Sequence, residues 1–270
     1  MFKPILGLKA SADPQQLASR LRYKPEVFEF YTSQDDFSKE GLKRLAEAIL
    51  QVQDQATRRI VLHQPMKYQG EFLEMITSQE ILPETYYFLE KSTNDLLELA
   101  FDHDCQVLIH GSYELKNPQV LAYYKTLEQA RQTSFERLDY FSQLGGQRIL
   151  FENGISPIFF FGDPDYDQEI LKRGYRLAFD TSHALIKAQG NNQILLDSLE
   201  RLKANIHYYH LVDSMGMTHD SLTLGEGITD WPQVLQRLNP KASAIYEIVV
   251  KDVNDPKEQL ASHEFLSKLV

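Results

Sequence analysis

Short apolar runs rich in β-branched and aromatic residues alternate along the whole chain with segments of helical period. Several of these runs are continuously apolar, which is typical of parallel strands that helices cover on their outer face. Eight such runs are present, at residues 5–9, 27–31, 59–63, 106–110, 148–152, 176–180, 207–211 and 244–249. The pattern therefore predicts a series of eight β-then-α units.

The segments between the runs each have one face to bury. Leu42, Leu45 and Ile49 follow the i, i+3, i+7 spacing of an amphipathic helix. Asp13 stands directly before Pro14, which is the signature of a capped helix start. These features indicate helices that pack against a parallel sheet.

Eight β-then-α units in unbroken order fit an α/β fold, a single closed (β/α)₈ TIM barrel, because right-handed crossovers make closure the natural topology. No Gly/Ser linker or abrupt change of composition divides the chain. We therefore expect one domain over residues 1–270. The connection 64–83 is polar and long, and we place it over the barrel mouth as a candidate lid.

The net charge and the number of cysteines limit the possible binding partners of the protein and its cellular compartment. The chain has 270 residues and a net charge of −10, which disfavours nucleic acid as a partner because binding to phosphates needs a basic face. Its one cysteine, Cys105, excludes an internal disulfide and a thiolate zinc site of the finger type, and indicates a reducing compartment. Residues 1–9 lack the features of a signal peptide, and no apolar run approaches the ~20 residues of a membrane span. We expect a soluble, cytoplasmic protein.

Ionisable residues close six of the eight apolar runs. They are His63, His110, Glu152, Asp180, His210 and Glu247. Helix capping explains any one of them equally well, but not the set. In a parallel barrel the carboxyl ends of all strands meet at one face, so three imidazoles and three carboxylates share a cavity there. Carboxylates at such short distances repel one another, so we expect a divalent metal ion between them.

Five motifs, in order along the chain, carry a resemblance to a known family. They read F-E-N at 151–153, F-D-T-S-H-A at 179–184, H-L-V-D-S at 210–214, L-G-E-G-I-T-D-W at 224–231 and Y-E-I at 246–248. Together they resemble the xylose isomerase-like TIM barrel superfamily, from about the third strand to the end of the chain. That superfamily includes sugar isomerases and epimerases and also the endonuclease IV type of abasic-site nuclease.

The isomerase and epimerase branch implies one set of ligands for a divalent metal ion, which is Mn²⁺, Mg²⁺, Co²⁺ or Zn²⁺. Carried over strand by strand, the ligands are Glu152, Asp180, His210 and Glu247. The resemblance implies that the ion binds a substrate carbonyl and its neighbouring hydroxyl. Glu152 and Glu247 then act as catalytic residues that move a proton through an enediolate.

Two further histidines are candidate substrate-binding residues in this branch. His183 follows Asp180 by three residues and is well placed for a substrate hydroxyl, and His219 lies just before the L-G-E-G segment.

The nuclease branch implies further metal ions. His63 and His110 with Glu152 resemble its first zinc site and are candidates for a second metal here. Its third site takes His183 and a D-x-H motif, but the corresponding positions read His219, Asp220 and Ser221. This departure predicts that a third ion is weak or absent. The loop 31–37 also lacks an arginine that could enter DNA.

These observations favour a divalent-metal-dependent isomerase or epimerase of carbohydrate metabolism, acting on a small sugar or sugar-like substrate, phosphorylated or not. A dehydratase, an endonuclease IV-like hydrolase of abasic sites and a non-catalytic metal-binding descendant remain alternatives. The choice of sugar and of metal stays open. A homodimer is a further expectation, since members of the superfamily often pair.

Overall fold

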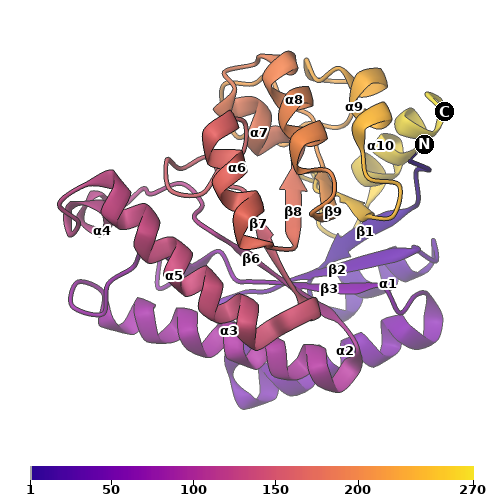
Figure 1. Cartoon of the computed structure of the whole chain (residues 1–270). Helices are drawn as coiled ribbons and strands as arrows, with labels where there is room; N and C mark the ends of the chain where they lie inside the picture. Colours follow the sequence, from indigo (N-terminus) through magenta and orange to yellow (C-terminus); the bar gives the residue numbers. More distant parts are fainter. Residues whose placement is uncertain (1) are drawn as a thin grey trace.

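The computed structural model describes residues 2–270 and confirms the predicted (β/α)₈ barrel (Figure 1). Met1, within the N-terminal segment discussed above, lies outside the described residues. The eight parallel strands are, in sheet order, β1 (Gly7–Ala10), β2 (Val27–Tyr31), β3 (Ile60–His63), β6 (Gln106–His110), β7 (Ile149–Glu152), β8 (Leu177–Asp180), β9 (Ile206–Leu211) and β10 (Ser243–Tyr246). Each lies within one of the predicted runs or differs from it by one to three residues at an end.

Helices connect the strands and cover the outside of the barrel (Figure 1). They are α1 (Pro14–Leu21), α2 (Lys39–Gln55), α3 (Pro83–His103), α4 (Pro118–Ala122), α5 (Leu127–Gly145), α6 (Pro164–Arg173), α7 (Thr181–Lys187), α8 (Asn192–Leu202), α9 (Trp231–Arg237) and α10 (Lys257–Ser267). The Asp13 carboxylate caps α1 by accepting from the Gln15 and Gln16 amides, as predicted. Leu45 and Ile49 are buried on α2. Among residues 2–270, none of the helices is long and apolar enough to cross a lipid bilayer.

The barrel interior is built in layers, because every second residue of a strand points inward. Seven strands contribute to one apolar layer, which consists of Val27, Val61, Leu108, Leu150, Ala178, Tyr208 and Ile245. Two residues further along each of these strands lies an ionisable side chain. Strand β1 contributes Lys9, which lies two residues after Gly7. We call this layer the ionisable ring: Lys9, Glu29, His63, His110, Glu152, Asp180, His210 and Glu247.

Gly7 allows the first and last strands to come together. A Cβ built on Gly7 collides with the Ala244 carbonyl oxygen and stands only 2.8 Å from the Ile245 Cα atom. Both obstacles are backbone atoms, which cannot rotate away. A side chain at residue 7 is therefore incompatible with the observed approach of β1 to β10.

We expect Gly7→Ala to lower the free energy of unfolding by about 2–3 kcal/mol, since it overpacks a backbone contact. Urea denaturation monitored by circular dichroism measures this loss. Gly174→Ala is the matched control, because a Cβ there meets no atom within 4 Å and the cost is only the ~1 kcal/mol of a left-handed backbone conformation. Equal losses in the two variants would show that the seam between β1 and β10 tolerates a methyl group.

The candidate lid, residues 64–83, is more ordered than its composition suggests. It contains an antiparallel pair of short strands, β4 (Lys67–Tyr68) and β5 (Glu71–Phe72), and residues 73–78 are buried. The buried Glu74 carboxylate accepts hydrogen bonds from the backbone amides of Tyr113, Glu114 and Leu115 at 2.9–3.0 Å. This segment is thus tied to the loop that follows β6.

Candidate metal centre

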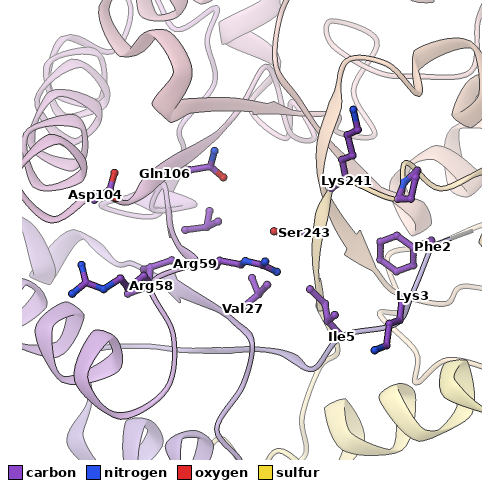
Figure 2. A pocket seen from close by; sticks show the side chains of 14 residues that line it. Phe2, Lys3, Ile5, Val27, Arg58, Arg59, Asp104, Gln106, Lys241 and Ser243 are labelled. Atoms are coloured by element: carbon purple, nitrogen blue, oxygen red, sulfur yellow. The ribbon is translucent and has the colours of Figure 1, made fainter.

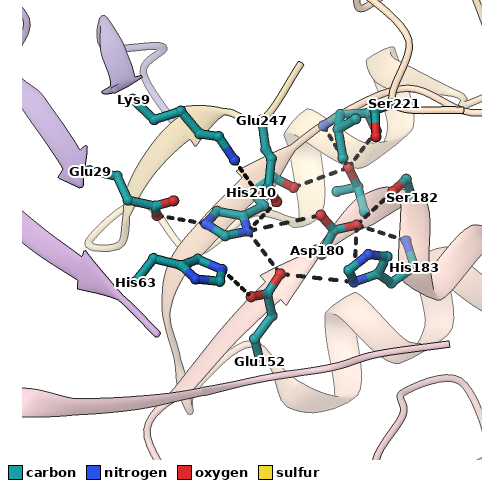
Figure 3. Close-up of polar contacts among 12 residues, drawn as sticks. Lys9, Glu29, His63, Glu152, Asp180, Ser182, His183, His210, Ser221 and Glu247 are labelled. Atoms are coloured by element: carbon teal, nitrogen blue, oxygen red, sulfur yellow. Dashed lines mark hydrogen bonds and ion pairs between the residues drawn. The ribbon is translucent and has the colours of Figure 1, made fainter. Parts of the chain in front are cut away.

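Four members of the ionisable ring converge on one point (Figure 3). Glu152, Asp180, His210 and Glu247 each offer a ligand atom, and these atoms all lie within 4.8 Å of one another. The Nδ1 atom of His210 is 2.8 Å from Glu152 Oε1 and 2.6 Å from Glu247 Oε2. Such a group can hold a single divalent cation.

The fit to a cation is supported by carboxylate oxygens that lack donors. Asp180 Oδ1 accepts from the Ser182 hydroxyl at 2.8 Å and from the His183 amide at 2.7 Å. Asp180 Oδ2 and Glu152 Oε2, both buried, have no hydrogen-bond donor among residues 2–270. Because a buried carboxylate oxygen without a donor is costly, a divalent ion is a suitable partner for these oxygens.

The His210 imidazolium and the neighbouring carboxylates stabilise one another in their charged forms. Burial acts to raise the pKa of Glu152 and of Glu247, but the positive His210 beside them holds both pKa values well below the usual range. Burial acts to lower the pKa of His210, yet the neighbouring carboxylates raise it well above its usual value. Burial raises the pKa of Asp180 to about 6. Both glutamates are therefore carboxylates at neutral pH, and binding of a cation would displace the His210 proton.

A second, nitrogen-rich group shares Glu152. The Nε2 atoms of His63 and His110 lie 3.4 Å and 3.2 Å from Glu152 Oε2. The Nδ1 atom of His63 donates to the Gln64 carbonyl at 2.7 Å. Burial acts to lower the pKa of His63, but the hydrogen bond to Glu152 and the charge of Glu29 raise it above its usual value, so a cation bound here would displace the Nε2 proton. Burial lowers the pKa of His110 to about 3, which keeps that imidazole neutral. These three residues can offer ligands to a second ion.

His183 and His219 contact each other in the wall of the cavity that lies above the ionisable ring. Their Nε2 atoms are 2.9 Å apart, while His183 Nδ1 lies 2.8 Å from the Asn153 carbonyl oxygen. Asp220 does not join them, because its Oδ2 accepts from the Met215 amide at 3.0 Å. Ser221 Oγ is 3.5 Å from His219 Nδ1. The His219–Asp220–Ser221 segment thus places the His219 imidazole, and not the Asp220 carboxylate, next to His183.

Two members of the ring, Lys9 and Glu29, were missed by the sequence analysis. The Lys9 ammonium forms an ion pair with Glu247. Burial alone would lower the pKa of Lys9, but Glu247 and Glu29 raise it above its usual value. Glu29 Oε2 lies 2.7 Å from His210 Nε2. Their positions in the sequence could have identified them. Each lies two residues after an inward-facing residue of its strand, as the six identified residues do.

The contact between Glu29 and His210 leads to a prediction. A proton on His210 Nε2 donated to Glu29 leaves the Nδ1 lone pair free for a metal ion. We expect Glu29→Gln to weaken Mn²⁺ binding by about 10–100-fold, measured by isothermal titration calorimetry. Tyr208→Phe is the control, because it removes the 2.9 Å bond of Tyr208 to the same oxygen and leaves the histidine contact intact. Unchanged affinity in Glu29→Gln would exclude this role.

A cavity of about 570 Å³ lies at the end of the barrel opposite to the ionisable ring (Figure 2). It is lined by the first residues of several strands, among them Val27, Gln106 and Ser243, and by Arg58 and Arg59. None of the predicted site residues lines it. In TIM barrels this face contributes stability, whereas chemistry takes place at the carboxyl ends of the strands.

Solved structures share this fold over nearly the whole chain. A D-tagatose 3-epimerase-like protein has a TM-score of 0.71 at 20% identity, covering 98% of this chain and 96% of that protein. D-psicose 3-epimerase from Clostridium cellulolyticum, in a structure with D-tagatose, has a TM-score of 0.67 at 12% identity, with 98% and 99% coverage. A protein from Thermus thermophilus, in a structure soaked with ZnCl₂, has a TM-score of 0.66 at 16% identity, with 98% and 97% coverage.

No protein-family model and no curated protein sequence matches the chain. At identities of 20% and below, the structural likenesses show the fold. That fold is the one expected from the resemblance to the xylose isomerase-like barrels.

Proposed function

We propose that this protein is a divalent-metal-dependent isomerase or epimerase that moves a proton next to the carbonyl of a small sugar-like substrate. The observation that carries the proposal is the convergence of Glu152, Asp180, His210 and Glu247 within 4.8 Å, with carboxylate oxygens left without donors. Two of the similar structures are described as a 3-epimerase and a 3-epimerase-like protein, which agrees with the proposal.

The four residues would hold the ion, with Asp180 and His210 acting as ligands only. The ion would supply positive charge to the substrate oxygens and so make the intervening C–H bond more acidic. The chain's own residues do the rest. Glu152 and Glu247 are carboxylates at neutral pH, the form that accepts a proton, and one can remove the substrate proton while the other returns it.

The remaining residues of the site would orient the substrate and protect the ligands. His183 and His219 line the cavity above the ring, and their paired Nε2 atoms would exchange that contact for one with a substrate hydroxyl. Lys9 pairs with Glu247 and limits the excess negative charge of the ring. Burial of six of the eight ring residues limits the access of bulk water, which strengthens these electrostatic contacts.

A metal-dependent phosphodiester hydrolase is the second candidate. The nitrogen-rich group of His63, His110 and Glu152 favours it, because a pair of ions that share a carboxylate suits phosphoryl chemistry. The net charge of −10 and the serine at residue 221 count against abasic DNA as the substrate.

Solvent deuterium uptake separates the two candidates. Purified protein loaded with Mn²⁺ or Co²⁺ is incubated in D₂O with a panel of ketoses, aldoses and their phosphates, and deuterium in the sugar is measured by mass spectrometry. We expect uptake at the carbon beside the carbonyl of at least one sugar. Incision of an abasic-site duplex at low salt, with no deuterium uptake, would replace the proposal by the hydrolase.

A further inference from the structure

The cavity above the ionisable ring has two kinds of lining. It has a volume of about 400 Å³, and its lining includes the polar groups of His183, His219 and Ser221. It also includes aliphatic side chains, which we call the apolar wall: Met66, Ile248, Val249, Val250 and Val253. A ligand anchored on the ring therefore meets both polar groups and hydrocarbon.

The apolar wall is fixed in place next to the proposed catalytic carboxylate. Ile248 to Val250 follow Glu247 directly in the sequence. The Val249 amide donates to the Ser221 carbonyl at 3.3 Å, and the Arg20 guanidinium donates to the Val253 carbonyl. Both anchors use backbone carbonyls or amides, so the valine side chains stay free to face the cavity. A hydrocarbon surface beside the reacting atoms favours an apolar group on the ligand.

The charges of the lining argue against a phosphate on the substrate. Among the lining residues, Lys9 alone carries a permanent positive charge, and Glu247 already pairs with it. Recognition of a phosphate normally uses arginine, lysine or free backbone amides at a helix start. The carboxylates of the ring add negative charge beneath the cavity. A phosphorylated sugar would thus bring about two more negative charges into a site that has no spare cation.

We propose, on the basis of the function proposed above, that the substrate is an unphosphorylated hydroxycarbonyl compound with an apolar substituent. Its hydroxycarbonyl end lies on the ionisable ring, and its substituent lies against the apolar wall. The cavity volume agrees with this, since pockets of ~300–1,000 Å³ hold ligands larger than a monosaccharide.

A matched ligand series tests the inference. Each ketohexose is offered to the Mn²⁺-loaded protein as the free sugar, as its 6-phosphate and as its 6-O-benzyl ether, with binding measured by calorimetry and deuterium uptake by mass spectrometry. For the best ketohexose, we expect the benzyl ether to bind at least about tenfold more tightly than the free sugar, and the phosphate more weakly than either.

Substitution of the apolar wall provides the matched variant. Val249 is 68% exposed, so Val249→Lys places a cation in the wall without disturbing the core. We expect it to reverse the order of the benzyl ether and the phosphate. Leu50→Lys is the control, because Leu50 is also an exposed apolar residue but lies on α2, away from the cavity, and it should leave the order unchanged.

The outcomes distinguish this inference from the proposed function. Deuterium uptake by a sugar or its phosphate, together with tighter binding of the phosphate or equal binding of all three forms, would overturn the inference and leave the isomerase proposal intact. If neither this series nor the wider panel of ketoses, aldoses and their phosphates takes up deuterium, both are overturned, since the inference depends on the proposed function.

Discussion

Glu247→Gln is expected to slow exchange of the substrate's α-hydrogen with solvent deuterium by about 10²–10⁴-fold while the protein still binds metal. Glu247 Oε2 lies 2.6 Å from His210 Nδ1, so an amide oxygen at that position can still contribute to the ligand group. The amide cannot accept a proton from carbon, however. Exchange rates by mass spectrometry and Mn²⁺ affinity by calorimetry, measured on the same preparation, separate the two roles of the residue.

Two results would contradict this interpretation of Glu247. The first is exchange at the wild-type rate in Glu247→Gln, which would show that the carboxylate carries no proton. The second is a loss of exchange that follows the loss of metal in proportion, which would make Glu247 a ligand only. Ser221→His serves as the control, because it rebuilds the histidine of the nuclease motif next to His219. An isomerase gains no incision activity from that change.

The second large effect is expected at Glu152, which belongs to both metal-binding groups. Glu152→Gln removes the charge that faces His63 and His110 as well as a ligand of the four-residue group. We expect it to lose the bound metal and to fall below detectable exchange. Metal content by inductively coupled plasma mass spectrometry and deuterium uptake provide the two measurements.

His110→Gln is the matched comparison, because it removes one ligand of the nitrogen-rich group and leaves the four-residue group complete. We expect this variant to retain one ion per chain. Loss of all metal from His110→Gln, with retention in Glu152→Gln, would contradict the assignment of the principal ion to the four-residue group. Two ions in the wild-type protein would shift the balance toward the hydrolase.

The period of the apolar residues was sufficient to predict the barrel. Continuous apolar runs such as 106–110 and 149–152 are typical of strands buried on both faces, and the helical spacing between them is equally local. Because the carboxyl ends of parallel strands meet, the ionisable residues that close those runs could be grouped before any coordinates were known. Local physics therefore determined the fold and six of the eight residues of the ring.

Pairing within the ring depended on the tertiary structure. Glu29 lies in the middle of an apolar run, where a charge could equally face solvent, and Lys9 is separated from Glu247 by 238 positions in the sequence. Contact between such residues depends on the register in which neighbouring strands of the closed barrel meet, which no local pattern encodes.

The same reason applies to the apolar wall, whose parts come from the loop after β3 and from residues 248–253. By itself the sequence determined the strands, the helices and the chemistry at the strand ends. Only the tertiary structure decided which charges neutralise one another and which hydrocarbon faces the site, because those contacts join distant segments through the register and closure of the sheet.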